Sequence, residues 1–159
     1  MIIDQTGDGS GNPLYNANSI AGDGDGNIYL SGAGSNNAFR IASDGAITKV
    51  IDQAGGGISN LLTPRGIAVD RQGHVYIGGS SSDNAFDISP GGTITEIIDE
   101  TGDGEGNLLD TLRAIATDGA GNVYVCGGYT NNAFRIALDR VFSDGFETGS
   151  TSGWSDSQP

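Results

Sequence analysis

An all-β fold is predicted by three features of this 159-residue sequence. First, the tripeptide Asn-Ala-Phe recurs at Asn37, Asn84 and Asn132, so a unit of about 47 residues occurs three times. Second, residues 23–42 and 118–137 are identical at 13 of 20 positions. Third, the chain contains 28 Gly, and its apolar residues gather in short β-prone clusters, which suits strands joined by tight turns. Short strands in a repeat of this length are typical of propeller blades, so we predict a partial β-propeller of about three four-stranded antiparallel blades.

The middle copy of the repeat shows all four strands of one blade. They are predicted at Gly66–Asp70, Val75–Gly79, Ala85–Ser89 and Thr93–Ile98. The turns between them are rich in Gly, Ser, Asp and Pro, which favour reversal of the chain. The last strand alternates polar and apolar residues, as a half-buried strand at a sheet edge does.

The first and third copies follow the same plan. The first has predicted strands at Ser19–Gly22, Ile28–Ser31, Ala38–Ala42 and Ala46–Ile51. The third has them at Ala114–Thr117, Val123–Gly127 and Ala133–Ala137. Its fourth strand is missing or is replaced by Arg140–Phe142, where the repeat pattern stops. Because Met1–Ile3 matches Lys49–Ile51, we expect the chain to open on the end of a preceding fourth strand.

The repeat divides the chain into residues 1–139, which form the blades, and a C-terminal tail, residues 140–159. The three blades cover about residues 1–49, 50–96 and 97–139. Closed propellers usually need four to eight blades, so three blades leave two apolar faces open. Either the chain is a fragment of a longer propeller, or two copies form a homodimer that completes a six-bladed ring.

Composition excludes several classes of partner. Seven Lys and Arg against 20 Asp and Glu give a net charge of −13, which repels nucleic acid. The sequence contains no apolar run long enough for a membrane span, and its start lacks the features of a signal peptide. If the chain is part of a longer precursor, we expect that precursor to be secreted or periplasmic.

The stretch Pro64–Ile77 resembles the units of the NHL-repeat and SBBP-repeat β-propellers, in which a Gly-Ile-Ala-Val-Asp strand, a turn and a Val-Tyr-Val strand follow one another. The resemblance extends over about residues 2–138. Asn-Ala-Phe replaces the Asn-Arg-Ile pattern that is common in NHL repeats, which favours the bacterial SBBP-like variant. Residues 141–155 resemble a tail found at the C-termini of many exported proteins of Gram-negative bacteria. Either Phe142, Phe146 and Trp154 dock on the blades, or the tail is a disordered extension.

One loop imitates a calcium site. In Asp99–Asp110, oxygen-bearing side chains stand at alternate positions and Gly stands at position six, as in a calcium-binding loop. If the site existed, its ligands would be Asp99, Asp103, Asn107 and Asp110. We nevertheless interpret the loop as a Gly-Asp turn between blades, because the other copies lose the ligand pattern and no flanking helices are predicted. We therefore expect no metal site and no cofactor.

The sequence offers few residues for catalysis. The single His74 takes the position of Asn27 and Asn122 in the other copies, which predicts a turn residue, and the single Cys126 cannot form an internal disulfide. Arg40 and Arg135 share one position and could face a carboxylate of a neighbouring blade. We expect no catalytic residues.

Three functions remain open. The first is a non-enzymatic β-propeller module that binds a protein or a glycan through its loops, in the bacterial envelope or outside the cell. The alternative is part of a propeller enzyme of the lyase or lactonase type, whose active centre lies in missing blades. The third is a passive repeat whose stack of blades is stabilised by calcium.

Overall fold

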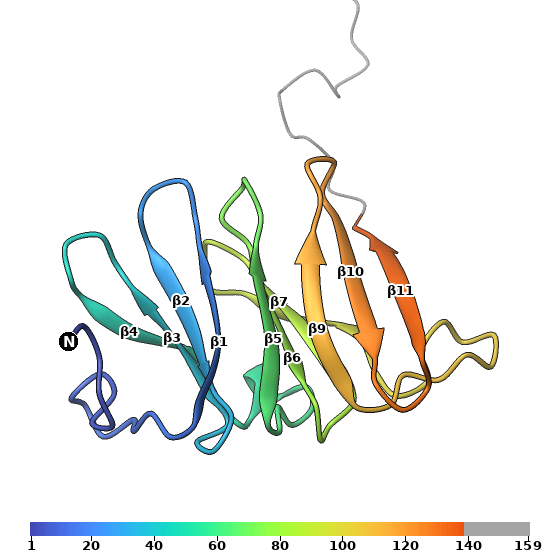
Figure 1. The fold of residues 1–159 in the computed structure, drawn as a ribbon. Coiled ribbons are helices and arrows are strands. Elements are labelled where there is room, and N and C mark those ends of the chain that lie inside the picture. The colour runs from blue at the N-terminus through green and yellow to red at the C-terminus, as the bar shows by residue number, and fades with distance from the viewer. Residues whose placement is uncertain (139–159) are drawn as a thin grey trace, which may run out of the picture.

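The computed structural model describes residues 1–138, which form three antiparallel sheets standing side by side (Figure 1). The first sheet contains β1 (Ala17–Gly22), β2 (Ile28–Gly32), β3 (Asn37–Ile41) and β4 (Ile47–Ile51). The second contains β5 (Pro64–Val69), β6 (Val75–Gly79), β7 (Asn84–Ile88) and β8 (Ile94–Ile98). The third contains β9 (Leu112–Thr117), β10 (Asn122–Gly127) and β11 (Asn132–Ala137). A short 3-10 turn, η1 (Gly55–Gly57), lies in the linker between the first two sheets.

Each sheet is a meander in which strands that follow one another in the sequence pair with one another. This is the strand order of a propeller blade, so the prediction of an all-β partial propeller is confirmed. We call the sheets blades 1, 2 and 3. Blade 3 has three strands among the described residues, and the segment expected to supply a fourth, 140–142, lies outside them together with the rest of the tail.

The blades are held together by apolar side chains that project from both faces of each sheet. We call the face that points to the following blade the leading face and the opposite one the trailing face. Between blades 1 and 2, Tyr29 and Ile51 of one leading face pack in a cluster with Ile67 and Phe86 of the next trailing face. Between blades 2 and 3, an equivalent cluster includes Tyr76. The core is thus divided into layers between sheets, as in other repeat proteins.

The packing explains the Asn-Ala-Phe motif. Strand residues alternate between faces, so Ala85 and Phe86 of blade 2 lie on opposite faces, and both are fully buried. The small Ala allows the next blade to approach, and the Phe ring fills the space beside the linker. A Cβ added at Gly55 would lie 2.9 Å from the Phe86 ring, so this linker position has no room for a side chain.

Two strand predictions need correction. The first strand of each blade begins earlier than expected, at Ala17, Pro64 and Leu112. In each blade, the pairing of the first strand with the second is irregular near the N-terminal end of the first strand, and it resumes beyond this irregularity. Residues 1–4 form no strand, since a fourth strand pairs with the third strand of its own blade and the described chain contains no blade before blade 1. Ile3 instead packs on the trailing face of blade 1.

Candidate functional site

The linkers between blades and the β2–β3, β6–β7 and β10–β11 hairpins lie at one end of the blade row, the lower edge in Figure 1. We call the surface formed by residues 4–16, 52–63 and 99–111 and by hairpins 33–36, 80–83 and 128–131 the linker face. Loops presented by a rigid sheet scaffold are common positions for binding residues.

Backbone strain concentrates on the linker face. Among the described residues, six that are not Gly have a positive φ, and all six belong to this face. They are Asn16, Asn36, Thr63, Asp83, Thr111 and Asn131. Asn and Asp tolerate this conformation, but a β-branched Thr rarely adopts it. Such strain persists only where surrounding contacts impose it, so Thr63 and Thr111 mark a strongly constrained surface.

Hydrogen bonds between blades impose that conformation. The backbone N–H of Thr63 in blade 2 donates to Asn36 Oδ1 of blade 1 at 2.8 Å. The N–H of Thr111 in blade 3 donates to Asp83 Oδ1 of blade 2 at 2.6 Å. Within each blade, the carbonyl of the same Thr accepts a bond from the neighbouring hairpin, at 3.1 Å from Ser80 and at 2.9 Å from Gly128. Each Thr is therefore fixed from both sides.

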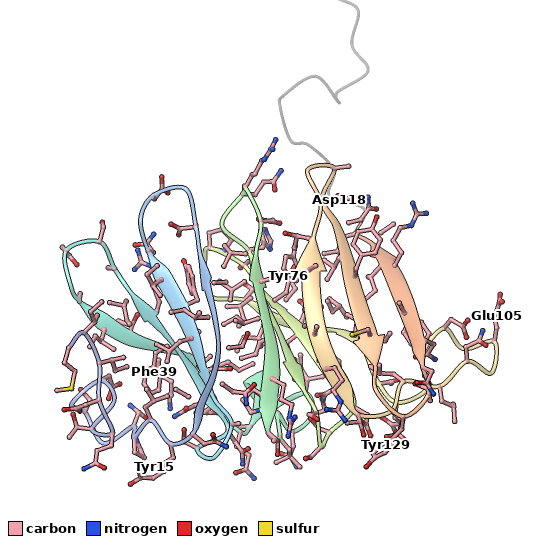
Figure 2. All side chains as sticks on the ribbon, in the orientation of Figure 1. Tyr15, Phe39, Tyr76, Glu105, Asp118 and Tyr129 are labelled. Carbon is pink, nitrogen blue, oxygen red and sulfur yellow. The ribbon has the colours of Figure 1, made fainter. Side chains whose placement is uncertain are left out.

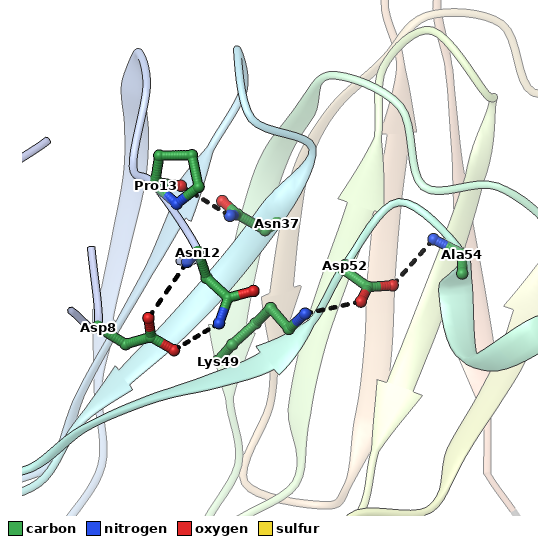
Figure 3. A network of polar contacts seen from close by, with 7 residues as sticks. All are labelled: Asp8, Asn12, Pro13, Asn37, Lys49, Asp52 and Ala54. Atoms are coloured by element: carbon green, nitrogen blue, oxygen red, sulfur yellow. Dashed lines mark hydrogen bonds and ion pairs between the residues drawn. The ribbon is translucent and has the colours of Figure 1, made fainter. Parts of the chain in front are cut away.

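The Asn of each Asn-Ala-Phe motif ties its hairpin to the linker. Asn37 Nδ2 donates to the Pro13 carbonyl at 2.9 Å, as Figure 3 shows. Asn84 and Asn132 make the same bond to the linkers of their own blades. In Figure 3, Asp8 accepts two bonds from Asn12 and so closes the first linker into a compact turn.

Large apolar side chains are exposed on this constrained surface. Tyr15, Ile58, Leu108 and Tyr129 are each more than half exposed, and Figure 2 shows Tyr15 and Tyr129 at the lower edge. The tyrosines are specific to their blades, since Tyr15 corresponds to Leu62 and Asp110, and Tyr129 to Gly34 and Ser81. They are therefore not required by the repeat.

Two of the few cations of the chain lie at the same end. Arg65 and Arg113 are the second residues of β5 and β9, and both are exposed. A Cβ added at Gly128 would lie 2.4 Å from Arg113 Nε, so the guanidinium lies against the β10–β11 hairpin that carries Tyr129. Tyr and Arg are the residue types enriched where proteins bind other molecules.

The opposite end carries one carboxylate per blade, Asp23, Asp70 and Asp118, around a groove of about 400 Å³. Each closes the turn after the first strand of its blade. Each also accepts a hydrogen bond from the hydroxyl of the Tyr six residues later, as Asp70 does from Tyr76 at 2.9 Å. Hydrogen bonds from the side chain and backbone of Asn122 lower the pKa of Asp118 to about 2. These carboxylates act as turn residues.

The loop that imitates a calcium site is folded by its own local hydrogen bonds. Asp99 accepts bonds from Thr101, and Asp103 accepts bonds from Glu105 and Asn107. Asn107 turns its amide nitrogen, a donor, toward Asp103. Asp110 bonds the neighbouring Thr111 hydroxyl. Within residues 1–138, no group of three or more His, Cys, Asp or Glu residues is arranged to hold a metal ion.

His74 has a partner that the repeat alignment did not reveal. His74 directly precedes β6, and its Nδ1 lies 2.7 Å from Oδ1 of Asp87 in β7. At the same two positions of blade 1, Arg40 Nη2 donates to Asn27 Oδ1 at 2.8 Å. Arg40 is thus bonded within its own blade, and not to a carboxylate of a neighbouring blade as the sequence allowed. Both positions differ between the two blades, Asn27 and Arg40 in blade 1 against His74 and Asp87 in blade 2, and this joint change was the sequence signal of the contact.

A second groove, of about 600 Å³, lies between blades 1 and 2 toward their outer strands. Its lining includes Arg40 and Lys49, together with Asp23 and Tyr29. Lys49 bonds Asp52 at 2.8 Å (Figure 3), and that bond lowers the pKa of Asp52. Burial and the nearby Asp23 raise the pKa of Tyr29. The cations of this groove are therefore already paired with groups of the protein.

Comparison with known proteins agrees with the fold. Residues 52–87 match the model of the SBBP family, which is described as a beta-propeller repeat. The chain thus contains a β-propeller repeat. No curated protein matches the chain. The SBBP match covers most of blade 2, including β5, β6 and most of β7.

Solved structures with a similar fold belong to propeller proteins. A gluconolactonase from Xanthomonas campestris aligns with a TM-score of 0.60 at 11% identity, over 79% of this chain and 45% of that one. Regucalcin from Agrobacterium tumefaciens, a calcium-binding protein, aligns with a TM-score of 0.54 at 16% identity, over 77% and 45%. An inactive virginiamycin B lyase from Staphylococcus aureus with quinupristin aligns with a TM-score of 0.52 at 13% identity, over 77% and 41%. The chain spans less than half of each of them.

The described residues contain no helix with the length and apolar character needed to cross a membrane.

Proposed function

We propose that the chain is a non-enzymatic β-propeller repeat module that binds a protein or glycan through the linker face, in the bacterial envelope or outside the cell. The observation that carries this proposal is the set of exposed, blade-specific apolar side chains on that face. Residues that the three blades share pack between sheets or close turns. The exposed side chains of Tyr15 and Tyr129 do neither.

The linker face suits binding because its backbone is fixed before any partner arrives. The bonds that the Thr63 and Thr111 N–H groups donate to Asn36 and Asp83 hold the loops without a ligand. A preorganised surface loses little conformational entropy on association. Tyr adds to this, since its ring gives a large contact area with few rotatable bonds, and it can stack on a sugar ring while its hydroxyl bonds the polar edge.

The test is a binding measurement with matched variants. Wild-type protein is immobilised and exposed to a panel of bacterial envelope polysaccharides, and binding is followed by biolayer interferometry. Tyr15→Ser combined with Tyr129→Ser is expected to weaken the strongest interaction at least about tenfold, because each interfacial Tyr contributes roughly 1–2 kcal/mol. Arg71→Ser is the control, since Arg71 is exposed at the opposite end of the blades. Equal binding by all variants would contradict the proposal.

An enzyme of the propeller lyase or lactonase type is the second candidate. Two observations favour it: the fold is similar to that of a gluconolactonase, and this chain spans less than half of that protein. In this case the chain would supply some blades of a larger active centre. Hydrolysis of gluconolactone by a protein that joins this chain to the remaining blades, with no hydrolysis by this chain alone, would favour this candidate over the binding module.

The proposal includes a homodimer that completes a six-bladed ring. The aligned part of the chain covers 45% of the gluconolactonase chain, so two copies would cover about nine-tenths of it, twice 45%. Two arcs related by a twofold axis bring each leading face onto the trailing face of the other copy.

A further inference from the structure

Both blade junctions within the chain use the same hydrogen bond, which we call the clamp. A side-chain oxygen in the hairpin of one blade accepts the N–H of the left-handed residue that precedes the next blade. The two clamps join Asn36 to Thr63 and Asp83 to Thr111, at 2.8 and 2.6 Å. Because the residues on each side occupy equivalent positions in the repeat, the clamp belongs to the blade junction itself.

The two ends of the row present the two halves of a third clamp. Asn16 of blade 1 stands at the donor position and Asn131 of blade 3 at the acceptor position. Within residues 1–138, neither the Asn16 N–H nor Asn131 Oδ1 has a hydrogen-bond partner. Yet Asn16 has a φ of 52°, the same as Thr63, and Asn131 has a φ of 53°, close to that of Asp83 at 50°. Both halves thus have the backbone conformation of a closed clamp.

The trailing face of blade 1 matches the faces that are covered elsewhere. Ile20 is 69% exposed, whereas the corresponding Ile67 and Ile115 are 6% and 8% exposed because the preceding blade covers them. Ala17 at the start of β1 is exposed, whereas the corresponding Pro64 and Leu112 are buried.

The leading face of blade 3 is open in the same way. Tyr124 is 39% exposed, while Tyr29 and Tyr76 at the same position are 5% and 0% exposed beneath the following blade. Ala133 is exposed, although its counterparts Ala38 and Ala85 are fully buried. The two open faces therefore have the composition of the two halves of one existing interface.

We infer that blade 3 of one chain docks on blade 1 of a second copy, and that Asn131 Oδ1 accepts the N–H of Asn16 across this junction. The inference rests on the proposed homodimeric ring and assigns the residues that close it. Ile20 is then covered as Ile67 is, and Tyr124 as Tyr76 is. The occupant is a second copy because the junction continues an interface already present twice in the chain, and because two arcs of three blades close on themselves with this junction repeated twice.

A native cysteine makes the junction directly testable. Cys126 is a free thiol at the position of Gly78 in blade 2. A Cβ added at Gly78 would lie 2.4 Å from a methyl group of Leu112 in the next blade. Since Ala17 stands at the position of Leu112, the junction places Cys126 beside Ala17 of the second copy. A Cys at position 17 is then within the reach of a disulfide.

The first experiment measures mass by sedimentation equilibrium on the 159-residue chain. We expect a species of about 32 kDa, twice the 16.1 kDa of one chain. Ile20→Lys is expected to weaken the dimer at least about a hundredfold, because it buries an unpaired charge at the junction. Ile58→Lys is the matched control, since Ile58 is similarly exposed but lies on the linker face. Circular dichroism should show that both variants keep the wild-type fold, because both side chains are exposed in the monomer.

The second experiment introduces Ala17→Cys and oxidises the protein with copper phenanthroline. Non-reducing electrophoresis should show a disulfide-linked dimer in high yield, and Ile58→Cys should show little. A monomer of 16.1 kDa at all concentrations, with no cross-link at position 17, would overturn the inference and assign the open faces to further blades of the same repeat. A dimer that persists in Ile20→Lys and fails to cross-link would place the interface elsewhere. Neither readout depends on ligand binding, so failure here is distinct from failure of the binding proposal.

Discussion

The middle blade and the two end blades have equivalent apolar residues at their packed positions, but they differ in what covers these residues. Tyr76 and Ile67 of blade 2 are 0% and 6% exposed, whereas Tyr124 of blade 3 and Ile20 of blade 1 are 39% and 69% exposed. Burial at these positions is therefore decided by the neighbouring blade and not by the residue. Stability in such an array is a sum of contributions from each repeat and from each interface between neighbours.

The largest expected effect is a core truncation in the middle blade. Phe86 is fully buried between blades 1 and 2, so Phe86→Ala should lower the free energy of unfolding by about 3–5 kcal/mol. Phe134→Ala in blade 3 should cost less, because that ring is only half-buried. Urea titration followed by far-UV circular dichroism, which reports on the backbone, measures both values. Equal losses would remove the distinction between the blades.

The next effect concerns the Tyr hydroxyl that bonds the turn Asp after the first strand of each blade. In blade 2 the buried Tyr76 hydroxyl donates to the Asp70 carboxylate at 2.9 Å. Tyr76→Phe should lower the free energy of unfolding by about 1.5–3 kcal/mol, the usual range for a hydrogen bond to a charged group. Tyr124 makes the equivalent bond to Asp118 at an exposed position, so Tyr124→Phe should have little effect. A thermal-melt comparison in which both variants behave alike would show that the middle blade is not the better protected one.

A stabilising change is expected at the left-handed position before β5. Thr63 has a φ of 52°, where blade 1 has Asn16 with the same φ. Thr63→Asn keeps the N–H that donates to Asn36 and should raise the free energy of unfolding by about 1 kcal/mol, because Asn adopts this conformation more easily than a β-branched residue. The Asn16→Thr variant should show the opposite sign. No gain from Thr63→Asn in chemical denaturation would contradict the role of strain.

The smallest effect is the dependence of stability on acid. Hydrogen bonds from Asn122 lower the pKa of Asp118 to about 2, below the value of about 3.9 in an unfolded chain. A lowered pKa in the folded state adds stability above about pH 4, and this contribution is lost as the pH falls toward 2. The melting temperature should fall over that range, and slightly less steeply in Asp118→Asn. A melting temperature that rises on acidification would contradict the sign.

The repeat predicted most of the fold because each blade is defined by residues that recur at constant spacing. The paired strands, the turns and the Asn-Ala-Phe motif all follow from that spacing. The starts of the first strands of the blades could not be predicted from the repeat spacing. In blade 2, β5 extends past an irregularity in pairing between Pro64 and Gly66, which the spacing does not reveal. The prediction of a strand at residues 1–3 was wrong, because the similarity of these residues to residues 49–51 does not show whether a partner strand is present.

The candidate site was harder to predict than the fold. Alignment of the copies makes shared residues conspicuous, whereas the exposed Tyr15 and Tyr129 are those that the copies do not share. The left-handed conformation of Thr63 is also hidden in the sequence, because Thr is an unusual residue there. The pairing of His74 with Asp87 could have been found by noticing that both positions change together between blades 1 and 2.

The central claim is that each leading face packs directly on the trailing face of the next blade, and one nuclear Overhauser measurement tests it most directly. The position of a Cβ at Gly78 lies 2.4 and 2.5 Å from the two methyl carbons of Leu112. Strong cross-peaks are therefore predicted between the Gly78 α-protons and both Leu112 methyl groups, in the dimer and the monomer alike. Their absence in a folded protein, with Gly78 contacting another segment instead, would contradict the packing of the blades.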